Sequence, residues 1–209
     1  HCQEGPEKGT GKGFQGEKPL LRQGSMKEYL NFIKEVEGLK STLRTAWTVS
    51  GRQESTAEHS WRLALGAAVL CHEFPELDRE KVMLMCLVHD LGELYSGDVS
   101  AALRPDAGKK HDQEQRDVER AAASLPKACA EEIRSLCEEY NRAGTPEARF
   151  VKAMDKAETI LQHSQGKNPP DFDYGFNLSY GREYFGQDGR LEELRELVDR
   201  ETEKRMEEP

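Results

Sequence analysis

Apolar residues recur every three or four positions along most of the chain from Lys27 onward, which is typical of amphipathic helices. The first stripe contains Tyr29, Phe32, Ile33, Val36 and Leu39. A second helix is expected to begin at Ser55, because Ser55 followed three residues later by Glu58 forms a capping box. Its apolar positions are Leu63, Ala64, Ala67, Ala68 and Cys71. Both segments therefore predict helices with one buried face.

A third helix is expected to begin at Asp78, a favourable N-cap, and to contain the apolar run 82–88. The run is apolar on every side of a helix, so we expect it to lie in the core. His89 and Asp90 follow the run directly, and Gly97 is expected to end the element. A carboxylate beside a core segment is costly to bury unless something pairs with it.

The second half of the chain also favours helices. The expected elements are a loop over 99–110, helices over 111–125 and 127–141, a helix that Thr145 caps and Pro146 opens, a loop over 164–181 and a last helix from Leu191 to about Met206. No pair of alternating strands is evident. The predicted fold class is therefore all-α.

Length and composition extend this picture. The chain has 209 residues, enough for one domain with a core, which we expect to span 26–209. Residues 1–25 are rich in glycine and lysine, which predicts a disordered leader or a cloning-derived tail. No apolar run reaches the roughly 20 residues of a membrane span. With no signal peptide evident and five cysteines lacking a C-x-x-C motif, we expect a cytoplasmic protein without a membrane partner.

The net charge of −9 argues against binding of a nucleic acid polymer, which requires a basic face. It does not exclude a small anionic substrate. A site for such a substrate would have to supply its positive charge locally, from arginine, lysine or a metal ion.

Candidate chemistry lies in polar residues near apolar helical stripes, namely His59, the pair His89 and Asp90, and Asp155. Two imidazoles and two carboxylates suit a divalent ion such as Mn, Co, Zn or Mg. Each residue alone has an ordinary alternative. His59 could make a local hydrogen bond, Asp90 could face water, and Asp155 could pair with a neighbouring lysine. The remaining histidines His72, His111 and His163 are interpreted as surface, cap or packing residues.

Two further carboxylates strengthen the joint interpretation. Glu93 lies four residues after His89, which places it one helical turn further along the same face. Asp98 follows Gly97 just past the expected helix end. Carboxylates gathered in one region repel each other unless cations neutralise them. A purely structural role would seldom need this arrangement.

The segments AEHSW, HDLGE followed by GD, and AMDKAE resemble the HD-domain metal-dependent phosphohydrolases, in particular their 5′-deoxynucleotidase branch. The resemblance implies a single helical HD-domain bundle that forms a homodimer and acts on a small nucleotide. It implies that the metal ligands are His59, His89, Asp90 and Asp155. By the same resemblance, Glu93 and Asp98 would be the catalytic carboxylates near the attacking water.

The same branch has an Arg-Trp pair that helps to exclude the ribose 2′-hydroxyl. Arg44 stands at the matching distance before His59, but Thr45 follows it and the tryptophan comes later, as Trp47. Arg44 and Arg52 are candidates to face the phosphoryl oxygens. Arg62 could instead form an ordinary ion pair within its helix. Lys109 and Lys110 could close over the phosphate or remain a solvated charge pair.

Three functions remain open from the sequence. The first is removal of the 5′-phosphate from deoxynucleoside monophosphates by metal-activated water. The second is hydrolysis of another phosphorylated metabolite, or of nucleoside di- or triphosphates. The third is a regulatory protein in which the metal only braces the helices. Glu93 and Asp98 favour an enzyme, because a bracing site needs neither carboxylate.

Overall fold

The computed structural model describes residues 24–100, 103 and 106–207. Apart from Gly24 and Ser25, the segment predicted to be a leader or tail lies outside these residues. The helices are α1 (Met26–Glu35), α2 (Thr56–Leu70), α3 (Arg79–Val88), α4 (Ala107–Ala122), α5 (Lys127–Arg142), α6 (Pro146–Gln165) and α7 (Gly189–Glu207). Short 3₁₀ turns are η1 (Val36–Lys40), η2 (Cys71–Glu73), η3 (Leu91–Glu93), η5 (Tyr174–Leu178) and η6 (Arg182–Tyr184). The two strands are β1 (Leu43–Trp47) and β2 (Gln53–Ser55). The predicted all-α class is confirmed.

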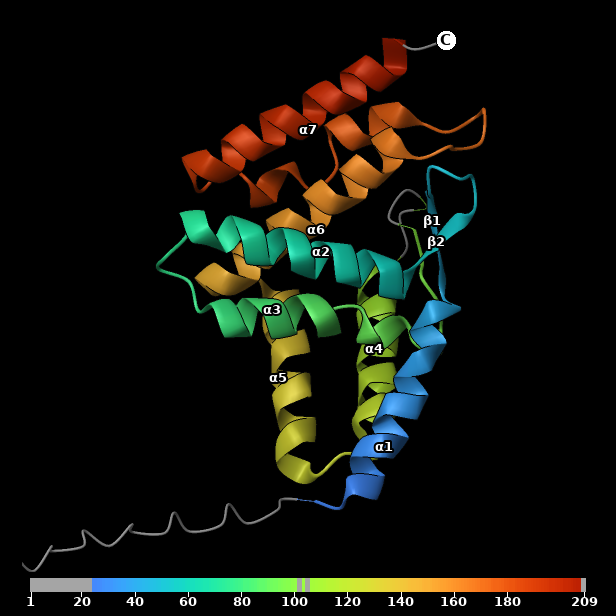
Figure 1. The fold of residues 1–209 in the computed structure, drawn as a ribbon, viewed down its shortest axis with the longest axis vertical. Coiled ribbons are helices and arrows are strands. Elements are labelled where there is room, and N and C mark those ends of the chain that lie inside the picture. Colours follow the sequence, from blue (N-terminus) through green and yellow to red (C-terminus); the bar gives the residue numbers. More distant parts are fainter. Residues whose placement is uncertain (1–23, 101–102, 104–105, 208–209) are drawn as a thin grey trace, which may run out of the picture.

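Helices α2, α3 and α6 form the centre of the molecule. Helix α2 packs against both α3 and α6, and α7 covers the far side of α6 (Figure 1). Helices α4 and α5 extend away from this centre, with α1 alongside α4 (Figure 1). The main core includes Leu63 of α2, Met85 of α3, and Val151 and Ile160 of α6, all essentially inaccessible to solvent. The three central helices are therefore held in fixed relation by buried apolar contacts.

The sequence analysis missed a small hairpin before α2. Strands β1 and β2 pair antiparallel, with Leu43 opposite Ser55 and Trp47 opposite Gln53, and the register shifts between these pairs. Gly51 adopts a φ of +87° in the connecting turn, a conformation that a side chain would strain. Strands this short and irregular leave no alternating pattern to detect. The hairpin leads directly into the first residue of α2.

The element that carries His89 also differs from the prediction, which extended it to Gly97. Helix α3 ends at Val88, and Asp90 has φ −100° and ψ 15°, outside the helical region. The 3₁₀ turn η3 follows, and Gly97 adopts a left-handed φ of +80°. The prediction that Glu93 lies one turn further along the same helix was therefore wrong. Glu93 reaches the same region from a separate turn.

Later boundaries follow the predictions with one further correction. Helix α4 begins at Ala107 because Asp106 caps it by accepting a hydrogen bond from the backbone of Lys109 at 3.1 Å. Part of the loop expected over 99–110 is therefore helical. Thr145 caps α6 with Pro146 in its first turn, and the last helix is found as predicted.

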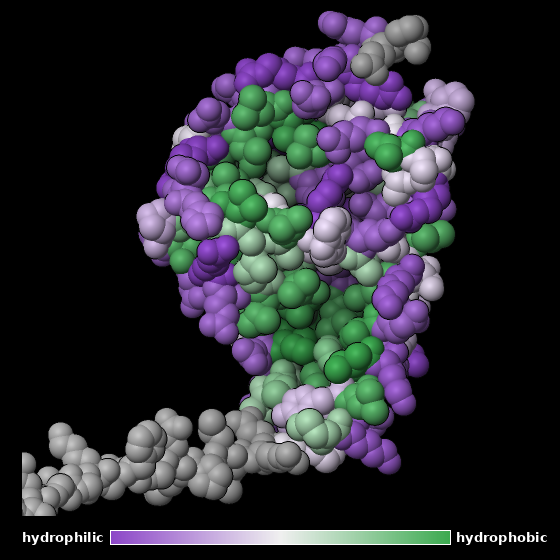
Figure 2. Space-filling view, in the orientation of Figure 1, coloured by the Kyte–Doolittle hydropathy of each residue, from purple (hydrophilic) through white to green (hydrophobic). Residues whose placement is uncertain are grey.

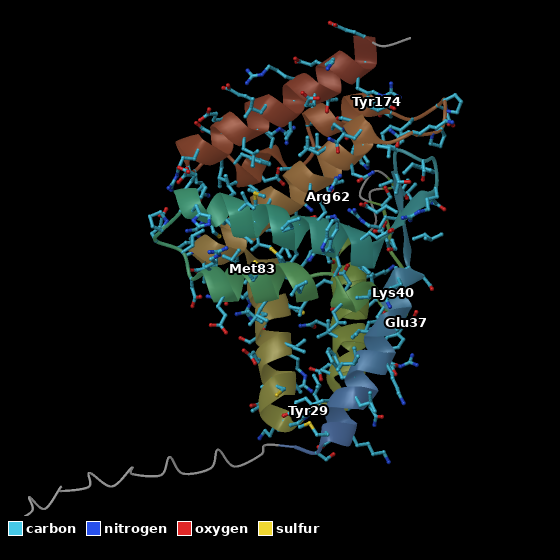
Figure 3. All side chains as sticks on the ribbon, in the orientation of Figure 1. Tyr29, Glu37, Lys40, Arg62, Met83 and Tyr174 are labelled. Atoms are coloured by element: carbon cyan, nitrogen blue, oxygen red, sulfur yellow. The ribbon has the colours of Figure 1, made fainter. Side chains whose placement is uncertain are left out.

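A buried polar network joins α6 to α7. His163 Nδ1 lies 2.8 Å from Asn177 Oδ1, Asn177 Nδ2 donates to Thr202 Oγ1 at 3.3 Å, and Ser164 Oγ lies 3.1 Å from the same hydroxyl oxygen. His163 is thus a buried member of this network, and it also lines a cavity between the helices. Tyr174, which begins η5, lies beside the end of α6 near α7 (Figure 3).

Apolar side chains also gather on the outer surface of the central helices. Figure 2 shows them over α2 and α3 on the face turned toward the reader. Trp61, Leu65 and Val69 of α2 are 63%, 52% and 65% exposed, and Leu87 of α3 is 50% exposed. Among the described residues, no helix is both long and apolar enough to cross a membrane.

Candidate metal centre and active site

His59 is fixed by the way α2 begins. Ser55 Oγ accepts a hydrogen bond from the Glu58 backbone at 3.3 Å, and the Glu58 carboxylate accepts one from the Ser55 backbone at 2.9 Å. This reciprocal cap defines the first turn of the helix. The His59 imidazole is thereby turned inward, where it is completely buried.

His89 and Asp90 lie where α3 ends. The Nδ1 atom of His89 makes a 2.9 Å hydrogen bond with the Cys86 carbonyl oxygen, one turn earlier in the helix. That bond leaves Nε2 directed away from the helix. The backbone departs from helical geometry at Asp90. The Asp90 carboxylate therefore turns back toward His89, and its Oδ2 lies 3.0 Å from His89 Nε2.

Asp155 enters the group from the middle of α6. Its Oδ2 accepts hydrogen bonds from Tyr140 Oη at 2.6 Å and from Lys156 Nζ at 2.8 Å. These two donors hold the carboxylate in one orientation. Its other oxygen, Oδ1, faces the two histidines.

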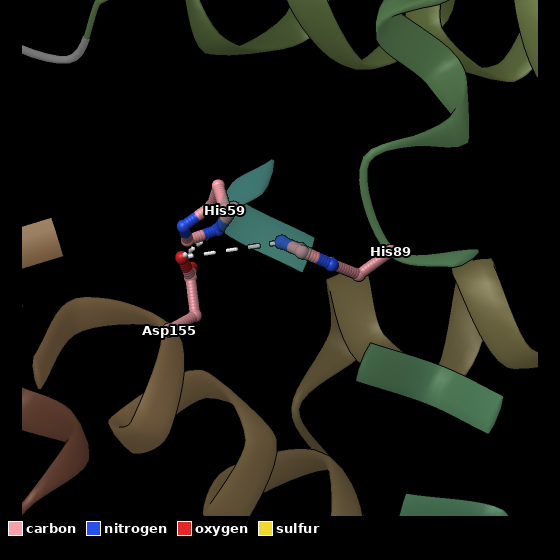
Figure 4. A group of neighbouring side chains, drawn as sticks. All are labelled: His59, His89 and Asp155. Atoms are coloured by element: carbon pink, nitrogen blue, oxygen red, sulfur yellow. Dashed lines mark ion pairs between the residues drawn. The ribbon is translucent and has the colours of Figure 1, made fainter. Parts of the chain in front are cut away.

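The four predicted ligands therefore converge, as Figure 4 shows for three of them. Asp155 Oδ1 lies 3.2 Å from His59 Nε2 and 3.9 Å from His89 Nε2 (Figure 4). Asp90 Oδ2 lies 3.7 Å from His59 Nε2. Both Nε2 atoms are buried, and neither has a hydrogen bond of acceptable geometry within the described part of the chain. Buried polar atoms are rarely left in this way. Ligand atoms of His59, His89 and Asp155 all lie within 4.8 Å of one another, and Asp90 Oδ2 approaches both imidazoles, a donor set that fits a divalent cation.

The electrostatics of the cluster support the same fit. Burial and Arg44 would lower the pKa of His59, but Glu158 and Asp155 outweigh them and raise it to about 10. Burial likewise opposes ionisation of Asp155, yet Lys156 and the histidines hold the pKa of this carboxyl well below its usual range. The field at this point is therefore negative, which stabilises positive charge.

Glu158, three residues after Asp155 on α6, supports His59 from behind. His59 Nδ1 hydrogen-bonds to Glu158 Oε2, and Arg62 Nε donates to Glu158 Oε1 at 2.6 Å. Arg62 stands on α2 facing α6 (Figure 3), so it pairs with Glu158 and not with Glu58, the helix ion pair that the sequence had suggested. A carboxylate behind a histidine ligand fixes its orientation.

Glu54, His59 and Glu158 form a second group of potential ligand atoms. The carboxylates of this group already have cationic partners. Arg44 Nη1 lies 2.8 Å from Glu54 Oε2, and Arg62 contacts Glu158. We therefore assign this group to the support of His59. The signal in the sequence was the spacing of Glu158 from Asp155, which places both on one side of α6.

The cluster lies in a cavity of about 200 Å³. Its lining includes the predicted ligands His89, Asp90 and Asp155, the carboxylates Glu93, Asp98 and Glu114, the cations Arg44, Lys110, Lys152 and Lys156, and the aromatic residues Tyr140, Phe176 and Tyr180. A cavity that combines a metal-type cluster, further carboxylates and several cations is suited to an anionic substrate.

Glu93 and Asp98 both line this cavity, as the sequence suggested. Thr56 Oγ1 donates a hydrogen bond to Glu93 Oε2 at 3.1 Å. Burial, and then the charges of Asp90 and Asp98, raise the pKa of Glu93 well above its usual range. A carboxyl in this environment is suited to holding a proton.

The predicted substrate residues are placed differently from one another. Arg44 is nearly buried in the cavity wall, where its Nη2 donates to Thr159 Oγ1 at 3.0 Å. Thr45 also lines the cavity, whereas Trp47 does not and instead makes an edge contact with Phe172. Arg52 lies on the hairpin, 59% exposed and paired with Glu58, and is not brought into the cavity.

Three of the described lysines line the cavity. The sequence analysis considered only Lys110 as a possible phosphate contact and did not place Lys152 or Lys156 in the site. Lys110 belongs to α4 and contacts the Val99 carbonyl oxygen at 3.2 Å, while Lys109 does not line the cavity. Lys152 Nζ lies 3.7 Å from the centre of the Tyr140 ring. Burial and the neighbouring Lys156 lower the pKa of Lys152 to about 8. These lysines supply local positive charge in an acidic protein.

Comparison with known proteins agrees with this site. The family model described as HD domain matches residues 36–195. The chain is 33% identical over 138 residues to human 5′-deoxynucleotidase HDDC2, covering 65% of this chain and 67% of that one. It is 34% identical over 137 residues to 5′-deoxynucleotidase hdd1 of Schizosaccharomyces pombe, covering 63% of this chain and 68% of the relative.

Among solved structures, a predicted metal-dependent phosphohydrolase from Magnetospirillum magnetotacticum MS-1 aligns with a TM-score of 0.73 and 26% identity, covering 86% of this chain and 96% of that one. The yeast HD domain-containing protein YGK1 aligns with a TM-score of 0.56 at 18% identity, which bears on the fold alone. Helices, ligand cluster and family match thus agree, and the chain belongs to the HD-domain family.

Proposed function

We propose that this protein is a divalent-metal-dependent phosphohydrolase that removes the 5′-phosphate from deoxynucleoside monophosphates. The observation that carries the proposal is the pair of buried Nε2 atoms of His59 and His89, which have no hydrogen bond among the described residues and face two carboxylates beside a cavity lined with acids and cations. The names of the similar proteins and the HD-domain match support the same reaction class.

His59, His89, Asp90 and Asp155 would hold the ion. A divalent ion bound there would lower the pKa of a water molecule and polarise a phosphoryl oxygen. Asp98 would accept a proton from the attacking water. Glu93, whose pKa is raised, would give a proton to the leaving 5′-oxygen as the phosphorus–oxygen bond breaks.

The cationic walls would face the charge that develops on the phosphoryl oxygens. Arg44 is held in place by Glu54 and Thr159, so its guanidinium is oriented before substrate arrives. Lys110 and Lys152 line the same cavity. Fixed cations aimed at developing negative charge stabilise a transition state without reorganisation.

The test is a phosphate-release screen over deoxyribo- and ribonucleoside monophosphates with Mn²⁺, Co²⁺, Mg²⁺ or Zn²⁺ added. We expect release that depends on the ion and stops with a chelator. Release only from di- or triphosphates, or from other phosphorylated metabolites, would favour the broader phosphohydrolase. An absence of any release, together with retained metal binding, would favour a regulatory protein braced by its ion.

The sugar preference forms a separate part of the proposal. Arg44 lines the cavity, and Trp47 lies at the end of the same strand. A hydrophobic wall rejects an added hydroxyl only weakly, by about 10²-fold at most. We therefore expect a modest preference for dAMP over AMP, measured as kcat/KM. Because Trp47 does not line the cavity, Trp47→Ala should reduce this preference only through β1, the strand that also carries Arg44. Equal values for both nucleotides in the unmodified protein would contradict the deoxynucleotidase assignment.

We also propose a homodimer that forms through the exposed face of α2. Trp61, Leu65 and Val69 are four residues apart and form one apolar stripe, beside Leu87 of α3. Exposed apolar patches of this kind mark interaction surfaces. Light scattering should give twice the chain mass for the unmodified protein and a lower mass for Trp61→Glu. A monomeric unmodified protein would contradict the proposal.

A cytoplasmic location is the remaining part of the proposal. Cys71, Cys86, Cys129 and Cys137 form no disulfide within the described residues, which is the usual state of cytosolic thiols. Cell fractionation with detection of the native protein tests this, and recovery in an oxidising compartment would contradict it.

A further inference from the structure

Two stacked aromatic rings lie in the wall of the largely polar cavity. Phe176 belongs to η5, and Tyr180 follows shortly after it. Their ring centres are 4.8 Å apart and the planes differ by 30°, so the rings are stacked. Both residues line the cavity and both are only partly buried. Part of the aromatic surface therefore remains available to a ligand.

The pair is tied to the metal-type cluster from one side. Lys156 Nζ donates to Tyr180 Oη at 3.0 Å and to Asp155 Oδ2 at 2.8 Å. One ammonium group thus connects the aromatic pair to a predicted metal ligand. The distance between the rings and the reacting phosphate would be set by this bridge.

The backbone beneath the rings is held from the other side by α7. The Arg195 side chain is 3% exposed and donates to the Tyr180 carbonyl oxygen at 2.5 Å and to the Asn177 carbonyl oxygen at 2.7 Å. Asp199 accepts a third hydrogen bond from Arg195 at 2.8 Å. The backbone of the segment that carries Phe176 and Tyr180 is therefore held in place by hydrogen bonds from α7.

A phenyl ring offers a flat apolar face and has no hydrogen-bonding group. The cations Arg44, Lys110 and Lys152 of the same cavity suit a phosphate group, whereas the apolar ring of Phe176 does not. A planar heterocycle is the part of a nucleotide that would gain from such a face, because base–aromatic stacking is favourable and tolerates every base. Tyr180 behind the phenyl ring completes a layered platform.

We propose that Phe176, backed by Tyr180, is the platform on which the nucleobase of the substrate stacks. The inference rests on the proposed nucleotidase function and adds the base subsite to it. Because Phe176 cannot form a hydrogen bond with a base edge, the platform contributes affinity without selecting purines over pyrimidines.

The test compares ligands with and without a base. In Phe176→Ala, KM for dAMP should rise by about ten-fold. The constant for 2-deoxyribose 5-phosphate, measured as substrate or as competing inhibitor, should stay within about two-fold. Phe176→Trp should retain tight binding of dAMP, since the flat apolar face is restored. The metal-loaded full chain is used throughout.

Tyr174→Ala is the matched control, because Tyr174 lies in the same 3₁₀ turn but does not line the cavity. It should leave the ratio of the two constants unchanged. Equal losses for dAMP and the base-free sugar phosphate in Phe176→Ala, or the same change of ratio in Tyr174→Ala, would overturn the platform. If the unmodified protein hydrolyses neither compound with any metal, the nucleotidase function fails, independently of the variants.

Discussion

Removal of the Glu158 carboxylate should weaken metal binding without abolishing it. Glu158 accepts hydrogen bonds from His59 Nδ1 and from Arg62, and so fixes the ring whose other nitrogen faces the cluster. Glu158→Ala removes the acceptor and leaves the four predicted ligands in place. The loss of such an outer partner typically costs about 10- to 100-fold in metal affinity, or about 1.4 to 2.8 kcal/mol.

The measurement is calorimetric titration of Mn²⁺ or Co²⁺ into the metal-free protein. Glu158→Gln should fall between the parent and Glu158→Ala, because its amide oxygen can still accept from His59 while the charge is lost. The control is Glu196→Ala on α7, because the Glu196 side chain is 72% exposed and its Oε2 lies 4.0 Å from Arg200 Nη1. This control should bind metal like the parent.

Two results would refute this reasoning. An unchanged affinity in Glu158→Ala would show that the orientation of His59 does not depend on the carboxylate. A complete loss of binding in a folded variant would show that Glu158 itself holds the ion, through the group it forms with Glu54 and His59. Thermal unfolding followed by circular dichroism distinguishes the second result from a loss of structure.

Three further predictions concern the cavity. Asp90→Ala should lose both bound metal and activity, since Asp90 faces both histidines, and full metal content in this variant would show the ligand set to be wrong. Glu93→Ala should retain metal but lose turnover by about 10²- to 10⁴-fold, so a wild-type rate would remove Glu93 from the mechanism. Because the pKa of Lys152 is lowered to about 8, its positive charge is present below that pH and is lost as pH rises through it, so kcat/KM should fall above about pH 8. Lys152→Arg, whose guanidinium stays charged, should extend activity to higher pH, and identical alkaline profiles would contradict this role.

Local sequence signals were enough to expect His59 and Asp155 on buried helix faces, where the structure brings them together with His89 and Asp90. His59 follows a capping box that fixes the first turn of α2, and Asp155 has the apolar spacing of α6 around it. Local rules of this kind suffice to place a side chain on a buried face.

Features that depend on contacts between distant segments were not predictable in this way. The bridge from Lys156 to Tyr180 joins residues on α6 and on the segment that follows η5, and nothing local to either residue signals it. The end of α3 at Val88 was missed because a continuous apolar run gives no sign of where the backbone turns. Phe176 lies in the stretch 164–181, which the sequence predicted only as a loop.

The polar network between α6 and α7 has a consequence for how the cavity keeps its shape. An interface made only of apolar side chains specifies its register less strictly than one that also carries buried polar groups, because apolar contacts are not directional. Asn177 and Thr202 permit few alternative pairings, since each misaligned arrangement would leave buried polar atoms unsatisfied. The network therefore fixes the register between the two helices, and apolar replacements should let the segment that carries Phe176 shift relative to Glu93 and Asp98, the proposed catalytic carboxylates.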